Sequence, residues 1–265
     1  MDLAAYLARI GLDPARALPP NVETLGLLTQ AHVTTIAFEN VDVQLGLPIR
    51  LDLESLEQKL VASRRGGYCF EQNGLFAEVL RQLGFDVTTL AARVRWNVSA
   101  GVPTPRTHRL SVVTIDGRRF IVDVGFGGFV PTAPIPFEHD APHVQSLGTF
   151  RVVRTGDAHT LQAQLETGFS DLYVFTEEPY GDVDYEVLNH FTSTHPTSRF
   201  KRALIVARPT VDARHTLLDG EYVVRSARGV EKRQVPAREV PALLRAVFDL
   251  DVRDEVVLPA LAGKP

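Results

Sequence analysis

The spacing of apolar residues changes once along this chain, close to Phe85, and this change limits the folds that the chain can adopt. Before Phe85, apolar residues recur every three or four positions, as Phe76 and Leu80 do in the segment 69–83, and this period predicts helices. After Phe85, short segments rich in β-branched residues alternate with turn residues, which is typical of antiparallel strands. Helices followed by antiparallel strands predict an α+β fold rather than alternating β–α–β units.

Capping and turn residues place the predicted elements. Asp2, Asn21 and Asp52 each precede an apolar run and can cap the helix that follows. Asp116-Gly117 is a strong signal for a two-residue hairpin turn. The predicted strands cover 87–98, 108–115, 118–124, 149–154, 160–165, 172–175, 204–207, 215–217 and 222–225, with a long loop over 130–147 and later helices over 182–189 and 240–250.

The composition excludes several classes of protein. The 265 residues carry 28 Lys and Arg against 32 Asp and Glu, a net charge of −4, so the basic surplus of a nucleic-acid-binding protein is missing. Apolar residues make up 45% and charged residues 23%, as in a folded globular protein. No apolar run approaches the ~18 residues that cross a bilayer, and the N-terminus does not resemble a signal peptide. We therefore expect a cytoplasmic protein that binds neither nucleic acid nor membrane.

The chain contains a single cysteine, Cys69, which rules out an intramolecular disulfide and any multi-cysteine zinc or iron–sulfur site. We expect no bound metal. Cys69 follows Gly66-Gly67-Tyr68 at the predicted start of a helix, where unpaired N–H groups favour an anion such as a thiolate. The same N–H groups can stabilise an oxyanion on a carbonyl that the sulfur attacks. The alternative is a small buried side chain behind an ordinary glycine turn.

The predicted hairpin brings a histidine and an aspartate together. With the Asp-Gly turn in place, His108 faces Gly125, and Asp123 faces Leu110 on the paired strand. His108 and Asp123 are then diagonal neighbours on one face of the sheet, about 7–8 Å apart. A carboxylate in this position can fix the imidazole tautomer and favour its protonated form. The alternatives are a structural histidine and a polar strand end, and a register shift of one residue would separate the two side chains.

Cys69, His108 and Asp123 together have the residue types of a nucleophile, a base and an orienting acid. The thiol would attack an acyl carbon as a thiolate beside an imidazolium, and a thioester would form. Such a thioester can pass its acyl group to water, as in a hydrolase, or to an amine, as in a transferase. The spacing of the three residues does not choose between these outcomes.

Five ordered motifs contain or flank these residues. They are Ile-Ala-Phe-Glu-Asn at 36–40, Arg-Gly-Gly-Tyr-Cys-Phe-Glu-Gln-Asn at 65–73, Thr-His-Arg-Leu at 107–110, Val-Asp-Val-Gly-Phe-Gly-Gly at 122–128 and Ser-Thr-His-Pro-Thr-Ser-Arg-Phe at 193–200. The set resembles the arylamine N-acetyltransferase family over essentially the whole chain, although Ala37 stands where the family usually has proline.

The resemblance implies a fold of three regions. They are an N-terminal helical bundle over 1–86 that carries the nucleophile, a central antiparallel β-barrel over 87–190 that carries the histidine and the aspartate, and a C-terminal α/β lid over 191–265. The core would be similar to that of the cysteine proteases.

The resemblance also implies an activity. It assigns the catalytic triad to Cys69, His108 and Asp123. It implies ping-pong transfer, in which Cys69 takes the acetyl group of acetyl-coenzyme A, the cosubstrate, and passes it to an arylamine, an arylhydrazine or an arylhydroxylamine. It implies no other partner, and the oligomeric state is not predicted.

Further residues are implied to contact the substrates. Those placed along the substrate and coenzyme A cleft are Phe38, Val94, Thr107, Gly125, Phe126, Gly128 and Phe129. Aromatic walls suit an aromatic acceptor, whereas the alternative for the phenylalanines is ordinary core packing. No motif identifies the residues that hold the coenzyme A diphosphate, for which Lys201 and Arg202 are candidates. Glu39 and Arg64 are expected to form an ion pair beside the loop before Cys69, unless each is solvated.

The sequence leaves two competing functions. One is a Cys-His-Asp hydrolase or amidase, or an amide synthase that uses another acyl donor. The other is a non-catalytic protein that keeps the fold. Acetylation of Cys69 by acetyl-coenzyme A, reversed by an aromatic amine, distinguishes the transferase from both.

Overall fold

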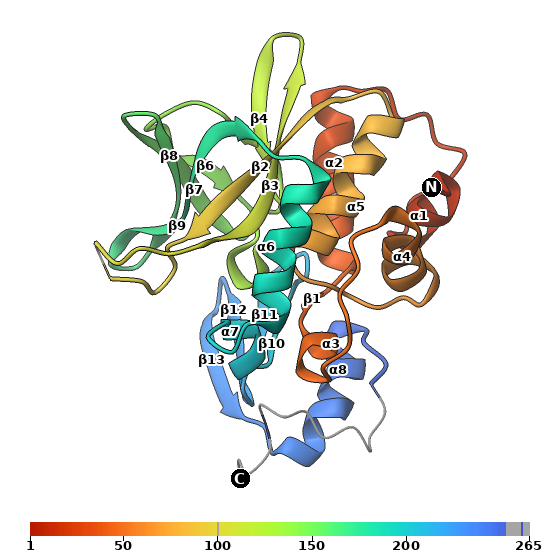
Figure 1. Cartoon of the computed structure of the whole chain (residues 1–265), viewed down its shortest axis with the longest axis vertical. Helices are drawn as coiled ribbons and strands as arrows, with labels where there is room; N and C mark the ends of the chain where they lie inside the picture. Colours follow the sequence, from red (N-terminus) through yellow and green to blue (C-terminus); the bar gives the residue numbers. More distant parts are fainter. Residues whose placement is uncertain (100, 253–260, 262–265) are drawn as a thin grey trace.

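The computed structural model describes residues 1–99, 101–252 and 261 of the chain. In Figure 1, the N-terminal helices pack beside a curled antiparallel sheet, and a smaller sheet with its own helices lies below both. This is the α+β arrangement that the sequence predicts. Within the described part of the chain, no helix combines the length and the apolar character that a membrane span needs.

Helices make up the first part of the chain. They are α1 (Leu3–Arg9), α2 (Val22–Thr35), α3 (Val41–Gln44), α4 (Leu53–Leu56) and α5 (Cys69–Gln82). The predicted caps are confirmed, because Asp2, Asn21 and Asp52 each accept a backbone N–H from the first turn at 2.9 Å. The third predicted helix differs from the prediction, since α4 passes directly into a π-helical turn, η1 (Glu57–Ala62).

An eight-stranded antiparallel sheet follows and curls into a nearly closed, barrel-like shape (Figure 1). Its strands are β2 (Asp86–Val94), β3 (Arg106–Ile115), β4 (Arg118–Val122), β5 (Ile135–Pro136), β6 (His143–Gln145), β7 (Gly148–Thr155), β8 (Ala158–Leu165) and β9 (Gly168–Pro179). They are hydrogen-bonded in the order β5-β4-β3-β2-β9-β8-β7-β6. The loop predicted over 130–147 contains two short strands, because β5 pairs with β4 and β6 pairs with β7.

The hairpin between β3 and β4 has the predicted register. Asp116 and Gly117 have positive φ angles of 49° and 74°, which a two-residue turn of this kind requires. The ladder accordingly begins with Ile115 opposite Arg118. The strand prediction for 118–124 is too long by two residues, so Asp123 lies just past the ladder rather than within a strand.

The second sheet brings early and late parts of the chain together. Its strands, in hydrogen-bonded order, are β1 (Phe38–Glu39), β10 (Ile205–Pro209), β11 (Ala213–Leu218), β12 (Glu221–Ser226) and β13 (Gly229–Gln234). The sequence does not predict β1 or β13, because β1 is too short to show alternation and β13 is exposed throughout. The helices of this half are α6 (Asp182–Thr194), α7 (Arg199–Arg202) and α8 (Val240–Phe248).

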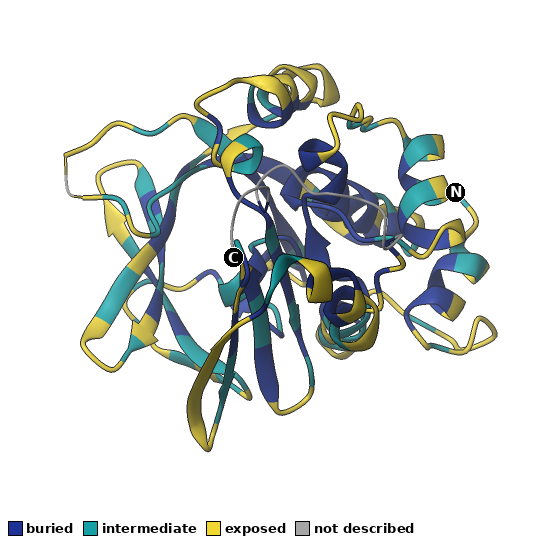
Figure 2. Cartoon of the chain, turned by 90° about the horizontal axis from the view of Figure 1, so that it is seen from below, coloured by how far each residue is buried: buried dark blue, intermediate teal, exposed yellow. Residues whose placement is uncertain are grey.

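Buried residues are concentrated where the helices and the two sheets meet (Figure 2). One apolar cluster joins the N-terminal helices to β3 and β4, a second fills the curled sheet, and a third lies between α8 and the C-terminal sheet. A fourth surrounds Cys69 and consists of Phe38, Tyr68, Phe70, Ala91, Tyr185 and Ala207. Cys69 therefore lies where all three parts of the fold meet.

A buried chain of hydrogen bonds runs from α1 to the loop before Cys69. The Tyr6 hydroxyl lies 2.8 Å from Nδ1 of His32, and Nε2 of His32 lies 3.0 Å from Oε1 of Gln72. The Gln72 amide nitrogen donates to the carbonyls of Ala37 and Gly67, so its oxygen must be the acceptor. His32 then carries its proton on Nε2 and accepts from Tyr6 at Nδ1. A neutral imidazole thus links the first helix to the glycine loop.

The buried imidazole predicts how stability depends on pH. Burial lowers the pKa of His32 from 6.5 to about 3. Between these values the unfolded chain binds a proton that the folded chain does not, so folding stability falls as the pH drops below about 6.5. We expect His32→Gln to weaken this dependence and His190→Gln, at an exposed position of α6, to leave it unchanged. Urea unfolding at about pH 7 and about pH 4.5 measures it, and equal losses of stability in wild type and His32→Gln would contradict the assignment.

Candidate active site

Cys69 is the first residue of α5 and is only 2% exposed. The two glycines before it are needed because no side chain fits in their place. A Cβ atom on Gly66 would lie 2.2 Å from the carbonyl oxygen of Ala37, and one on Gly67 would lie 2.8 Å from the carboxylate of Glu71. The loop therefore packs directly against the segment that leads into β1 and against the first turn of α5.

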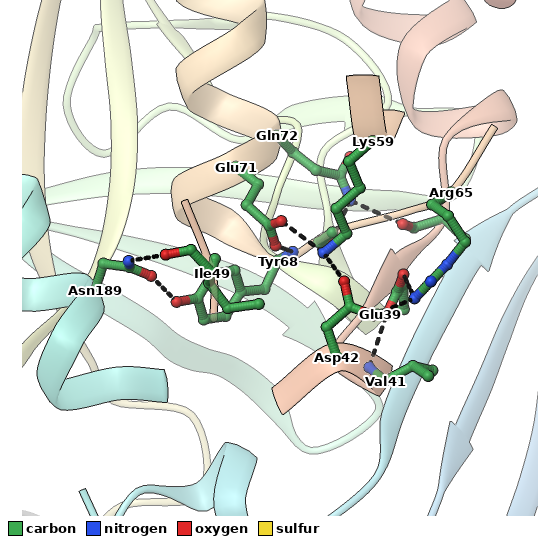
Figure 3. Close-up of polar contacts among 12 residues, drawn as sticks. Glu39, Val41, Asp42, Ile49, Lys59, Arg65, Tyr68, Glu71, Gln72 and Asn189 are labelled. Carbon is green, nitrogen blue, oxygen red and sulfur yellow. Dashed lines mark hydrogen bonds and ion pairs between the residues drawn. The ribbon is translucent and has the colours of Figure 1, made fainter. Parts of the chain in front are cut away.

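Glu71 fixes the start of α5. Its Oε2 accepts the backbone N–H of Tyr68 at 3.0 Å, and its Oε1 lies 2.6 Å from the Lys59 ammonium. Lys59 comes from the π-helical turn and lies 2.7 Å from Asp42 as well (Figure 3). The helix that begins with Cys69 is thus anchored by a buried carboxylate that has its own cation.

The prediction that Glu39 pairs with Arg64 is wrong, because Glu39 pairs with the next residue, Arg65. Arg65 lies 2.8 Å from Glu39 and 2.9 Å from Asp42, so that it continues the chain of charges that starts at Glu71 (Figure 3). Arg64 has a positive φ of 51°, and its side chain lies 3.3 Å from Asp249 just after α8. The conformation of one residue decides which of the two arginines faces the loop.

The charges of this network support one another. Burial raises the pKa of Glu71, and the Lys59 ammonium opposes that shift. Burial lowers the pKa of Lys59, but the carboxylates of Glu71, Glu39 and Asp42 raise it above its ordinary value. Lys59 therefore stays charged at neutral pH, and removing it would leave Glu71 buried without a cation.

His108 and Asp123 form a buried ion pair, as the hairpin register predicts. Nε2 of His108 lies 2.6 Å from Oδ2 of Asp123. The other carboxylate oxygen accepts Nδ2–H of Asn73 at 3.0 Å and the N–H of Gly125 at 2.9 Å. Both oxygens of the buried carboxylate therefore have donors, which is the condition for keeping a charge out of water.

The protein environment keeps both members of the pair charged. Burial lowers the pKa of His108, but the Asp123 carboxylate and then Cys69 oppose this and together raise it from 6.5 to about 10. Burial raises the pKa of Asp123, but His108, Asn73 and the Gly125 N–H hold it below its ordinary value. At neutral pH the pair is an imidazolium and a carboxylate.

Cys69 lies against this pair. A Cβ atom on Gly125 would lie 2.7 Å from Cα of Cys69, so the segment after Asp123 passes directly over the start of α5. The thiol donates to the carbonyl of Thr107 at 3.4 Å, and the sulfur is close enough to His108 to contribute to the raised pKa of the imidazole. Because Nε2 of His108 binds Asp123, Nδ1 is the ring nitrogen left for the sulfur. The structure thus brings the three predicted residues together.

Two residues around Asp123 are missing from the sequence prediction. Asn73 donates to Asp123 and accepts the Val124 N–H at 2.9 Å, so that it joins α5 to the hairpin. Its position four residues after Cys69, on the same face of a helix, is a signal that could have found it. The Tyr173 ring lies 4.8 Å from that of His108, and burial and then Asp123 raise the pKa of its phenol. No local pattern identifies Tyr173.

A cavity of about 380 Å³ opens onto Cys69 and His108. The residues predicted for the cleft all line it: Phe38, Val94, Thr107, Gly125, Phe126, Gly128 and Phe129. Trp96, just after β2, and Phe200, in α7, add two aromatic rings that the sequence prediction lacks. The cavity is therefore aromatic along much of its wall.

The C-terminal sheet supplies the opposite wall. Thr216 of β11 and Arg225 of β12 are among the lining residues. A Cβ atom on Gly128 would lie 3.0 Å from the Thr216 methyl group, so the two walls meet closely there. The sequence pattern does not predict this wall, because it depends on how two distant segments pack.

Lys201 and Arg202, the candidates for holding the coenzyme A diphosphate, lie outside the described lining of the cavity. The Lys201 ammonium donates to the carbonyl of Val43 at 3.2 Å, and Nε of Arg202 donates to that of Pro196 at 3.0 Å.

Within residues 1–99, 101–252 and 261, no group of three His, Cys, Asp or Glu side chains is arranged to hold a metal ion.

Comparisons with known proteins identify the family of the chain. Residues 21–257 match the family model described as N-acetyltransferase. The chain is 43% identical over 259 residues to the arylamine N-acetyltransferase of Mycolicibacterium smegmatis, covering 96% of this chain and 94% of that one, and 40% identical over 253 residues to that of Escherichia coli (strain K12), covering 94% and 89%. The structure of the Mycobacterium marinum arylamine N-acetyltransferase in complex with CoA matches with a TM-score of 0.93 at 37% identity, covering 98% of each chain. This chain belongs to the arylamine N-acetyltransferase family.

Proposed function

We propose that this protein transfers the acetyl group of acetyl-coenzyme A to an arylamine, an arylhydrazine or an arylhydroxylamine through a thioester on Cys69. The observation that carries the proposal is the buried pair of His108 and Asp123 against Cys69, at the floor of a cavity with aromatic walls. Family membership supports it, because the relatives are named for this reaction and one of them binds CoA. A cytoplasmic location suits an enzyme that depends on a free thiol.

In the first half-reaction, the Cys69 thiolate attacks the carbonyl carbon of the acetyl thioester. The bond between that carbon and the coenzyme A sulfur breaks, and the departing sulfur takes a proton from the His108 imidazolium. The N–H groups in the first turn of α5 are of the kind that stabilise the oxyanion formed on the way. One thioester replaces another, so the step costs little free energy.

In the second half-reaction, the amine attacks the thioester carbon. An aromatic amine is suited to this step because it is uncharged at neutral pH and keeps its lone pair. His108, now neutral, accepts the proton that the nitrogen loses, and the Cys69 sulfur leaves as a thiolate. The imidazolium and the thiolate are then restored, and Asp123 orients the ring throughout.

The cavity supports an aromatic acceptor. Phe38, Phe126, Trp96 and Phe200 line it, and the Phe126 ring lies 5.2 Å from that of His108 in an edge-to-face arrangement. An acceptor ring packed among them would gain both buried area and favourable ring geometry. We propose that the seven cleft residues predicted from the sequence contact the acceptor or the acetyl donor.

Intact-protein mass spectrometry tests the proposal. We expect acetyl-coenzyme A to add one acetyl group to the wild-type protein on Cys69, and aniline to remove it. Cys69→Ser should stay folded and gain no acetyl group, because the nucleophile is lost. Loss of the acetyl group to water with no effect of aniline would instead favour a hydrolase, and full turnover by Cys69→Ser would contradict the proposed nucleophile.

Asp123→Asn keeps the size of the side chain but removes the charge that holds His108 protonated. We expect kcat/KM for acetyl transfer to fall by roughly 10³-fold or more, as the loss of an orienting carboxylate does in comparable triads. Asp157→Asn, at an exposed position of the turn between β7 and β8, is the matched control. Steady-state kinetics of both variants decide the point, and a near-normal rate for Asp123→Asn would remove Asp123 from the triad.

His108→Gln should make the thiol less reactive, because the imidazolium that favours the thiolate is lost. We expect iodoacetamide to alkylate Cys69 at neutral pH about tenfold more slowly, or slower still, than in the wild type. His190→Gln, on the exposed face of α6, should react at the wild-type rate. If His108→Gln kept the same rate and the same pH profile, the thiol would not depend on the imidazole.

A further inference from the structure

Two arginines lie directly opposite each other in the C-terminal sheet, Arg214 of β11 and Arg225 of β12. Like charges in such a position repel, and Arg225 contributes to the lowered pKa of Arg214 after the larger effect of burial. Among the described residues, neither guanidinium forms an ion pair with a carboxylate. Holding two cations side by side costs free energy, so each arginine must be stabilised either by a bound anion or by contacts within the protein.

The structural reason is clear for Arg214. It is 4% exposed, its Nε donates to the carbonyl of Leu147 at 2.9 Å, and its Nη1 donates to that of Val130 at 2.8 Å. It also lies 3.5 Å from the carbonyl of Gly128. Arg214 therefore ties the turn that carries Phe129 to the C-terminal sheet, and it is a positioning residue for the two walls of the cavity.

Among the residues that the structure describes, no comparable partner accounts for Arg225. Its side chain is half-buried and lines the cavity, and its guanidinium lies 5.9 Å from the centre of the Phe129 ring. The Phe129 ring in turn lies 4.5 Å from that of Trp96. These contacts hold at the cavity wall a cation that has no carboxylate partner in the described part of the chain.

Arg225 lies toward the open end of the cavity. The lining residue Trp96 is half-buried and its neighbour Asn97 is exposed, whereas Cys69 and Phe38 at the other end are 2% and 7% exposed. Apart from His108 beside Cys69, the other described lining residues with charged side chains are Arg199 and Glu221, both exposed. Arg225 is thus the one half-buried cation among the described lining residues.

We propose that Arg225 binds a phosphate group of the acetyl donor, an inference that rests on the proposed function. In coenzyme A, a long flexible arm separates the thioester from the phosphates, so a thioester placed at Cys69 directs the phosphates toward the open end. The planar guanidinium matches two phosphate oxygens at once. A bound phosphate would also neutralise the repulsion between Arg225 and Arg214, which gives the opposed pair its reason.

Two donors test this role. Acetyl-coenzyme A carries phosphates, and p-nitrophenyl acetate acetylates a thiol without any. We expect Arg225→Gln to lower the ratio of kcat/KM for acetyl-coenzyme A to that for p-nitrophenyl acetate by about tenfold or more, chiefly through KM for acetyl-coenzyme A. Arg228→Gln, in the exposed turn after β12, should keep the wild-type ratio. Added salt should raise KM for acetyl-coenzyme A less steeply in Arg225→Gln than in the wild type.

The ratio separates the possible outcomes, because it compares two reactions of the same folded protein. An unchanged ratio in Arg225→Gln would overturn the proposal, since the side chain would then only support the wall. A ratio lowered equally in Arg228→Gln would overturn it as well, because general surface charge would explain the effect. If the wild type accepted an acetyl group from neither donor, the proposed function itself would fall, and this inference with it.

Discussion

The buried ion pair of His108 and Asp123 is the interaction on which the rest of the site depends. Two charges out of water are stable only if their remaining hydrogen-bonding groups are satisfied. The hairpin register brings the pair to 2.6 Å, and Asn73 and the Gly125 N–H supply the second carboxylate oxygen. Because Asn73 belongs to α5, the same hydrogen bonds that stabilise the acid also fix the helix that begins with Cys69.

Two further networks hold the other side of the cysteine. A charged one runs from Arg65 through Asp42 and Lys59 to Glu71, which binds the Tyr68 N–H. A neutral one runs from Tyr6 to Gln72 and binds the Gly67 carbonyl. The two networks act on neighbouring peptide groups of one loop, so the position of the thiol is fixed by groups that never touch a substrate.

The sequence predicts the parts of the site whose geometry is local. The Asp-Gly turn sets the register of His108 and Asp123, and the helix predicted to start at Cys69 begins at that residue. The missed features depend on distant segments: Tyr173 comes from another strand of the barrel, and the wall with Arg225 comes from a second sheet. The choice between Arg64 and Arg65 depends on one positive φ angle, which no residue pattern around it reveals.

Asp123 keeps His108 protonated beside Cys69 at neutral pH, and the proposed activity of the site depends on this. Nitrogen-15 NMR of the imidazole rings tests it most directly, with the His108 signals identified by their absence in His108→Gln. We predict that both ring nitrogens of His108 carry protons at neutral pH and that the ring loses a proton only near pH 10. A neutral His108 ring at neutral pH, titrating near the ordinary 6.5, would contradict it.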